Sequence, residues 1–244
     1  MRRIVLLAVL LLSTQAAEAE YLYKMTMVRA APGKLLELID LFEKRMSVYE
    51  TSGDEAPLRM RHAQGDQWDL LVMYPIESFS KYYAPERVEQ RKKAATASGL
   101  SEEEFSRLYY EYSSFHEDMI VKGPPLQDLR KAFAEAGYWH TEMFVALAGK
   151  RAELQEEREM ENAYLKNLGQ RTRFTLVQVE GAPWDIISLA FYRDGQEFGG
   201  RGDASPEEVD EAAKAAGFKG SEYIGPTMRK FVLYNRDTHG GTIQ

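Results

Sequence analysis

Apolar side chains recur at two spacings along the chain, and the change of spacing separates strands from helices. Residues 23–29 form a β-rich run. Residues 32–46 then repeat leucine and phenylalanine at helical spacing, after a Pro-Gly start, and Gly53 is placed to end this helix. We therefore expect the first ordered segment to be a strand followed by a helix.

A β-hairpin is predicted next. Residues 58–64 and 67–75 are apolar runs on either side of a turn at Gly65-Asp66. This turn fixes the pairing, and a slip of one residue would exchange the two faces of the hairpin. An equivalent turn at Gly181 gives the same apolar face. The predicted pairs on that face are Leu58 with Met73, Met60 with Leu71, Phe174 with Leu189, and Leu176 with Ile187.

The chain is an internal duplication. When the sequence is shifted by 116 residues, eleven of the 47 pairs between positions 23 and 69 are identical. The match includes a Gly-x-x-Trp-Asp corner at the start of both second hairpin strands. The identical pairs are Met27/Met143, Ala30/Ala146, Gly33/Gly149, Lys34/Lys150, Glu37/Glu153, Leu38/Leu154, Glu43/Glu159, Gly53/Gly169, Gly65/Gly181, Trp68/Trp184 and Asp69/Asp185.

Each copy has a second helix and a last strand. Ser101 and Ser205 open segments with capping-box spacing. Short strands are expected around 115–121 and 228–235, so each copy follows the order β-α-β-β-α-β of a ferredoxin-like unit. The segment 75–99 is charged and has no assigned structure. The predicted divisions are residues 1–19 as a signal peptide, 20–123 as the first repeat, 124–137 as a linker with a helix over Leu126–Ala136, and 138–244 as the second repeat.

The first residues resemble an export signal. Two arginines precede the apolar run Ile4–Leu12, and Ala17-Glu18-Ala19 is a small-residue cleavage site. The run is too short to span a bilayer. No cysteine follows it, which argues against a bacterial-type lipid anchor. We expect an exported protein, periplasmic or secreted, that has no membrane contact after cleavage near Ala19.

Composition narrows the function. The 244 residues are 44% hydrophobic and 28% charged, which is typical of a globular chain. A net charge of −7 argues against nucleic acid as a partner. Because the chain has no cysteine, disulfides, thiolate metal sites and a cysteine nucleophile are excluded. A small molecule is the expected partner, and the protein is expected to be a monomer or homodimer.

Two ferredoxin-like copies, each with a Pro-Gly-Lys or Gly-Lys helix start, resemble the dimeric α/β-barrel superfamily. Its members include antibiotic-biosynthesis monooxygenases, EthD-type and NIPSNAP-type proteins. The resemblance implies an α+β fold in which two antiparallel sheets face each other as one intramolecular barrel. It rests on architecture, since no catalytic motif of a subfamily is present, and it therefore implies the fold more than an activity.

A ligand site between the two sheets is the first functional hypothesis. If helices cover the more apolar sheet face, the opposite face lines the barrel interior with apolar, aromatic and a few polar side chains. A filled interior with polar residues at its rim explains the same pattern. The predicted ligand-binding residues are Arg59, Arg61, Trp68, Tyr74, His140, Glu142, Trp184 and Tyr192.

His140 and Glu142 are the candidate catalytic pair. They lie two residues apart on a strand and so project from one face, where an imidazole and a carboxylate serve as a base with its partner, or as metal ligands. A polar pair at a strand end is the simpler interpretation, and we predict no metal site. By contrast, the pair His62 and Asp69 and the two corner tryptophans are interpreted as structural.

The remaining histidines add one cofactor hypothesis. His116 resembles a haem ligand, because the chlorite dismutase group of this superfamily binds haem through a histidine; otherwise no cofactor is expected. His239 lies in a polar tail that is predicted to be disordered. Three functions stay open: an exported binder of a small apolar or aromatic molecule, a cofactor-independent monooxygenase-type enzyme centred on His140 and Glu142, and a structural or interaction protein with a filled barrel.

Overall fold

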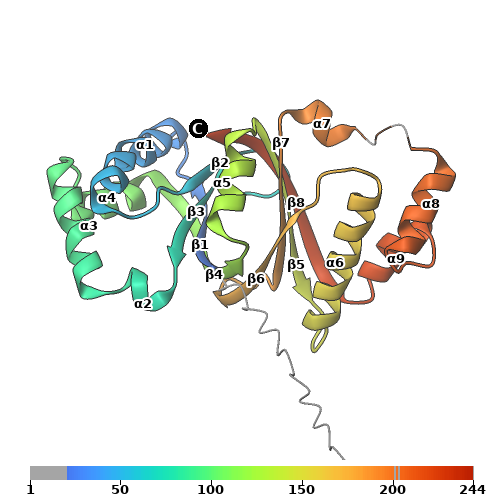
Figure 1. The fold of residues 1–244 in the computed structure, drawn as a ribbon. Helices are drawn as coiled ribbons and strands as arrows, with labels where there is room; N and C mark the ends of the chain where they lie inside the picture. The colour runs from blue at the N-terminus through green and yellow to red at the C-terminus, as the bar shows by residue number, and fades with distance from the viewer. Residues whose placement is uncertain (1–20, 201, 203, 244) are drawn as a thin grey trace, which may run out of the picture.

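The structure is a computed structural model that describes residues 21–200, 202 and 204–243 (Figure 1). The predicted signal peptide lies outside the described residues. Among them, no helix has the length and apolar character that crossing a membrane requires. The first half comprises β1 (Tyr21–Ala30), α1 (Leu35–Ser52), β2 (Leu58–Gln64), β3 (Leu70–Glu77), α2 (Phe79–Tyr82), α3 (Pro85–Ala97), α4 (Glu102–Tyr112) and β4 (Ser113–Gly123).

The second half follows a connecting helix, α5 (Leu126–Ala134). It comprises β5 (Tyr138–Ala146), α6 (Arg151–Asn167), β6 (Phe174–Gly181), β7 (Ile186–Tyr192), α7 (Gly195–Gly199), α8 (Pro206–Ala215), the 3-10 turn η1 (Ser221–Tyr223), α9 (Ile224–Met228) and β8 (Val232–Ile243). Figure 1 shows the helices of the two halves on opposite sides of the strands, with α5 between them.

The eight strands form one closed antiparallel barrel in the order β1-β3-β2-β8-β5-β7-β6-β4. The predicted fold class is confirmed: two tandem ferredoxin-like units share a single barrel. The halves join at two seams, where β8 pairs with β2 and where β4 pairs with β6. The last strand of each half thus lies beside the other half.

Both hairpins have the predicted register. Met60 pairs with Leu71 in the first half, and Leu176 pairs with Ile187 in the second. The repeated Gly-x-x-Trp-Asp corner has the structural role expected for it. A Cβ on Gly65 would lie 2.2 Å from a backbone oxygen of β8, and one on Gly181 would lie 2.4 Å from a backbone oxygen of β4. Each corner glycine therefore lets its hairpin approach the other half at a seam.

The corner aspartates serve both halves alike. The Asp69 carboxylate accepts the backbone N–H of Ala30 at 2.8 Å, and Asp185 accepts that of Ala146 at 2.9 Å. Each bond ties the second hairpin strand to the end of the first strand of its own half. The duplicated sequence thus preserves a duplicated set of hydrogen bonds.

The barrel interior is filled by the more apolar face of the strands, so the predicted orientation of the two faces is wrong. One buried cluster takes alternate residues from both halves and includes Leu129 of α5. Because residues of all the surrounding strands converge there, the interior buries more apolar surface than the faces under the helices. Its strand residues include Tyr23, Met25, Met27, Leu58, Met60, Leu71, Met73, Met119, Val121, Trp139, Met143, Leu176, Ile187, Leu189 and Phe191.

Other expectations need correction or completion. The unassigned segment 75–99 contains the end of β3 and the helices α2 and α3. The last strand begins at Val232, since Met228 closes α9, and it runs on to Ile243. His239, expected in a disordered tail, lies inside this strand and pairs with Gln64 and His140 on its two sides. Serine caps at Ser101 and Ser205 are confirmed.

Candidate functional site

The outer faces of the barrel, beneath the helices, carry the polar side chains of both halves. The two faces are related by the duplication. Thr26 of β1 lies opposite Asp118 of β4, and Glu142 of β5 lies opposite Asp237 of β8. The same two backbone positions therefore present a hydroxyl and a carboxylate in one half and two carboxylates in the other.

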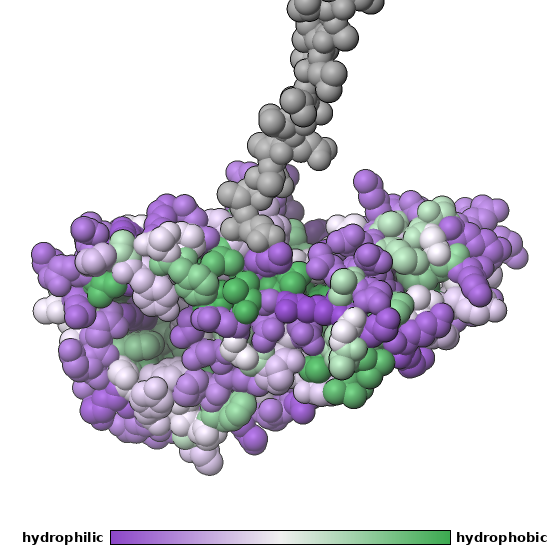
Figure 2. All heavy atoms as spheres, turned by 90° about the horizontal axis from the view of Figure 1, so that it is seen from below, coloured by the Kyte–Doolittle hydropathy of each residue, from purple (hydrophilic) through white to green (hydrophobic). Residues whose placement is uncertain are grey.

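The first half has a cavity of about 280 Å³ at this place, between α4 and strands β1, β3 and β4. Its floor is polar and its walls are largely aromatic. The polar residues are Lys24, Thr26, Glu102, Ser106, His116 and Asp118, and the aromatic residues are Tyr74, Phe105, Tyr109 and Tyr110. Figure 2 shows the molecular surface hollowed over the first half when it is seen from below.

Asp118 is the centre of the polar floor. One of its carboxylate oxygens accepts the Thr26 hydroxyl at 2.6 Å and lies 3.4 Å from the Lys24 ammonium. The other oxygen lies 3.9 Å from Nε2 of His116. One hydrogen bond, from Thr26, and two longer approaches, from the Lys24 ammonium and the His116 imidazole, thus meet at one carboxylate at the cavity.

Two aromatic rings of α4 pack against the histidine. The rings of Tyr109 and Tyr110 approach the His116 ring edge to face, with centroids 5.6 and 5.9 Å away. Phe105 stacks on Tyr109 at 6.1 Å. Burial raises the pKa of the Tyr109 hydroxyl well above its ordinary value, so the group stays protonated and remains a hydrogen-bond donor. Tyr110 and His116 are exposed and form the mouth of the cavity.

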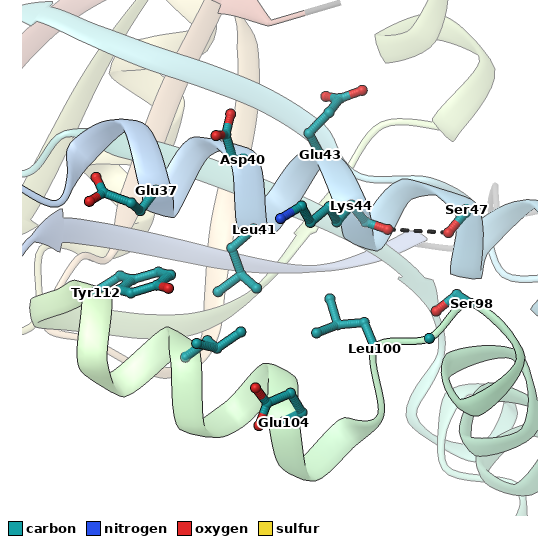
Figure 3. A pocket seen from close by; sticks show the side chains of 12 residues that line it. Glu37, Asp40, Leu41, Glu43, Lys44, Ser47, Ser98, Leu100, Glu104 and Tyr112 are labelled. Carbon is teal, nitrogen blue, oxygen red and sulfur yellow. Dashed lines mark hydrogen bonds between the residues drawn. The ribbon is translucent and has the colours of Figure 1, made fainter.

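Helix α4 is held over this cavity by a few side chains. The Arg45 guanidinium of α1 lies 4.8 Å from the Phe105 ring centroid and forms an ion pair with Glu102. No residue of α4 is fully buried. On its other side, α4 forms a groove of about 610 Å³ with α1, with Leu41 and Leu100 at its base and carboxylates along its rim (Figure 3). No histidine lines that groove.

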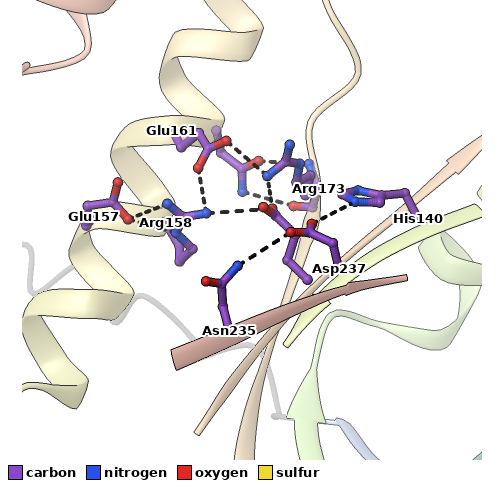
Figure 4. A network of polar contacts seen from close by, with 9 residues as sticks. His140, Glu157, Arg158, Glu161, Arg173, Asn235 and Asp237 are labelled. Carbon is purple, nitrogen blue, oxygen red and sulfur yellow. Dashed lines mark hydrogen bonds and ion pairs between the residues drawn. The ribbon is translucent and has the colours of Figure 1, made fainter. Parts of the chain in front are cut away.

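The second half carries a network of charged side chains above the corresponding positions of its own sheet (Figure 4). Arg158 of α6 is buried and lies 2.6 Å from the Glu161 carboxylate and 2.5 Å from that of Glu157. Arg173 lies 2.9 Å from Glu161 and forms a second ion pair with Glu142. These side chains lie over the sheet positions that correspond to the floor of the first-half cavity, but beneath α6, whose counterpart is α1, whereas the cavity itself lies beneath α4.

The predicted pair His140 and Glu142 shares one face, as expected, but each residue has its own partner. Nε2 of His140 lies 3.1 Å from the Asp237 carboxylate, whereas Glu142 engages Arg173. Burial raises the pKa of the Glu142 carboxyl, against the opposing effect of Arg173. The hydrogen bond from His140 lowers the pKa of Asp237. His140 is thus oriented by a carboxylate that sequence reasoning did not select.

The other predicted ligand-binding residues are dispersed. Only Tyr74 lines the first-half cavity. Trp68 and Trp184 belong to the barrel interior. Arg59 and Arg61 lie on β2, and Tyr192 contacts Phe198 of α7, so none of these three lines that cavity. Whether these residues bind a ligand stays a prediction.

Sequence reasoning missed the cavity because its residues come from separate segments. Tyr109 and Tyr110 lie on a helix whose pattern is equally typical of packing, and no local motif singles out Asp118. Two features of the sequence indicate these residues. Aromatic side chains recur along the helix that begins after Ser101, and the last strand of a ferredoxin-like half is expected beside its first strand, which carries Thr26. Within the described residues, no group of three or more histidines and carboxylates is placed to hold a metal ion.

Comparison with known proteins supports the fold. No protein-family model matches the sequence, and no curated protein matches it. Among solved structures, an anthrone oxidase-like protein has a TM-score of 0.58 at 13% identity, with 93% of each chain covered. A mutant chlorite dismutase from Candidatus Nitrospira defluvii has a TM-score of 0.50 at 12% identity, again over 93% of each chain. At these identities the likeness establishes a shared fold.

The residues do not fit the haem that the chlorite dismutase resemblance implies. A haem needs an axial ligand with free access to iron and a broad slot for its ring. Nε2 of His116 is directed at Asp118, and the adjoining cavity is only about 280 Å³. In the second half, Nε2 of His140 is engaged by Asp237, and the ion-pair network occupies the space beneath α6.

Proposed function

We propose that the first-half cavity binds a small planar aromatic molecule and that His116 removes a proton from it. The observation that carries this proposal is the Asp118 carboxylate at the floor of an aromatic-walled cavity, hydrogen-bonded by Thr26 and approached by Lys24 and His116. The cavity volume of about 280 Å³ is close to the lower limit of ligand sites, roughly 300 Å³. This favours a compact ring system over a long or branched ligand.

The polar residues at the floor of the cavity have separate roles in proton removal. His116 is the base, and Asp118 positions it and stabilises its protonated form. Their separation of 3.9 Å is longer than a hydrogen bond and is expected to shorten when a ligand excludes water. The Lys24 ammonium then lies beside the negative charge that develops on a ring oxygen. The Tyr109 hydroxyl, which stays protonated, is a second donor for that oxygen.

The reaction class that suits these groups is cofactor-independent oxidation of an aromatic ketone with an acidic CH₂ group, such as an anthrone. His116 takes one proton, and the resulting carbanion gives its electrons to O₂. The CH₂ carbon loses two hydrogens and gains one oxygen atom, while the second oxygen atom leaves as water. The likeness to an anthrone oxidase-like structure supports this chemistry, as does the base beside an aromatic wall.

The test measures anthrone binding and O₂ consumption by the purified protein. His116→Gln and Asp118→Asn are each expected to lower kcat about 100-fold while the protein still binds the ligand, because general-base catalysis contributes on that order. Asp40→Asn, on the exposed face of α1, is the matched control and is expected to leave turnover unchanged. Binding without O₂ consumption would leave a binding protein and end the enzyme proposal. Turnover that survives His116→Gln would remove that residue from the reaction.

A further inference from the structure

Phe198 of α7 lies inside a cage of aromatic rings on the second half. Its ring centroid is 5.0 Å from that of His140 and 5.7 Å from that of His239. The rings of Tyr138 and Tyr192 lie 5.3 and 5.4 Å away. Four rings from three strands therefore surround one side chain, at the separations that aromatic pairs prefer.

The side chain comes from the surface and is not part of the barrel core. Helix α7 has five residues and contributes no fully buried side chain. It is fixed by its Asp194 cap and by Glu197, which forms ion pairs with Arg171 and Arg193. Phe198 itself is half-buried. Such a helix can be withdrawn at the cost of a few exposed contacts, whereas the cage belongs to the barrel.

The floor of the cage holds an unused polar atom. His140 is only 6% exposed, and its Nε2 is engaged by Asp237 at 3.1 Å. Its other nitrogen, Nδ1, is buried and has no hydrogen-bond partner among the described residues. Buried polar groups are almost always paired, and an orphan nitrogen beside an apolar ring indicates a missing partner.

We propose that Phe198 occupies a binding site for a single-ring phenol and acts as its built-in plug. When α7 is withdrawn, the phenol ring takes the place of the Phe198 ring among the four aromatic side chains. Its hydroxyl pairs with Nδ1 of His140; because a hydroxyl both donates and accepts, it suits either tautomer of the imidazole. This site is separate from the first-half cavity and does not depend on the function proposed there.

The experiment removes the Phe198 ring by substitution and supplies a small aromatic ligand in its place. Phe198→Ala is titrated with phenol and with toluene, which has the shape of the missing side chain. Isothermal titration is expected to show one more bound equivalent than the wild-type protein, and the NMR signals of the His140 imidazole are expected to shift only in the variant. Phenol is expected to bind about three- to tenfold more tightly than toluene, from one additional hydrogen bond.

His140→Phe in the Phe198→Ala background is the matched control, since it keeps a ring and removes the nitrogen. There, phenol and toluene are expected to bind equally. A folded Phe198→Ala protein that takes up no additional equivalent overturns the proposal, and so does a phenol preference that survives His140→Phe. Should Phe198→Ala not fold, Phe198→Val keeps an apolar contact with the cage; absence of a phenol-dependent His140 shift in that variant overturns the proposal as well.

Discussion

The two halves share one backbone frame and differ in what fills the space beneath their helices. At positions related by the duplication, Phe42 of α1 corresponds to Arg158 of α6, and Thr26 corresponds to Glu142. In the first half the Phe42 ring packs against Phe105 and Tyr109 and leaves the cavity open. In the second half the guanidinium of Arg158 joins a network of carboxylates.

This difference shows where a duplicated barrel is free to diverge. The interior is shared, because side chains of both halves pack there, and the two seams need the same corner in each half. Each outer face contacts only its own helices. A change there affects one half alone, so one face can keep an open aromatic cavity while the other becomes a closed ionic cluster.

The largest expected effect comes from giving the second half the residue of the first. Arg158→Phe leaves the buried Glu157 carboxylate without its counter-charge and removes the second arginine near Glu142, and it is expected to lower the free energy of unfolding by about 3–5 kcal/mol. Adding Glu142→Thr and Glu157→Leu, again first-half residues, is expected to restore most of the loss. Urea unfolding measures both.

The control for this series is Lys93→Ala, which removes an exposed ion pair with Glu89 and is expected to change stability by less than about 0.5 kcal/mol. If Arg158→Phe unfolds like the wild-type protein, the ionic cluster does not stabilise the second half. The two halves would then differ in the residues beneath their helices but not in how those residues affect stability.

Substitutions at the two seams test whether both halves contribute equally to the closed barrel. Gly65→Ala and Gly181→Ala each place a Cβ against backbone of the other half, at φ values of +125° and +101°. Each is expected to cost at least about 2–3 kcal/mol, in similar amounts, measured by urea unfolding. Gly33→Ala is the control, since its φ of +76° is also unfavourable but nothing lies within 4 Å; about 1–2 kcal/mol is expected. Clearly unequal losses at Gly65 and Gly181 would contradict the symmetry of the seams.

The smallest expected effect is a pH dependence confined to the second half. Burial lowers the pKa of His239 from its ordinary value of 6.5. As the pH falls below about 6.5, the unfolded chain takes up a proton that the folded chain resists, so stability decreases toward pH 5. In His239→Gln, the unfolding free energy measured at pH 7 and pH 5 is expected to decrease less than in the wild-type protein. An identical decrease in both proteins would exclude His239 as a source of the pH dependence.

The sequence predicts the fold of this protein better than it predicts the candidate functional site. The glycine turns determine the pairing of both hairpins, because only one register places Met60, Leu71 and their equivalents on a single face. The duplication predicts a symmetric structure. The register is predictable because it depends on local geometry, on residues a few positions apart, and the symmetry is predictable because the two copies can be compared directly.

The candidate site depends on contacts that local patterns do not encode. Both sheet faces are covered, one by the other half and one by helices, so apolar character alone does not say which face lies inside. Asp118 meets Lys24 only through the pairing of β1 with β4, the first and last strands of that half. Likewise, Arg173 closes the space near Glu142 from the loop before β6. Which half keeps a cavity is decided by such distant side chains.

The seam between β2 and β8 also sets an order of events in folding. β2 pairs with β3 within its own hairpin, but its other edge is completed by residues 239–243, three quarters of the chain length away. Pairing over so long a separation is slow, and it cannot precede synthesis of the last strand. Until then β2 exposes unpaired backbone groups, the feature through which chains aggregate. β8, the last of the eight barrel strands along the chain, is therefore the one that closes the barrel.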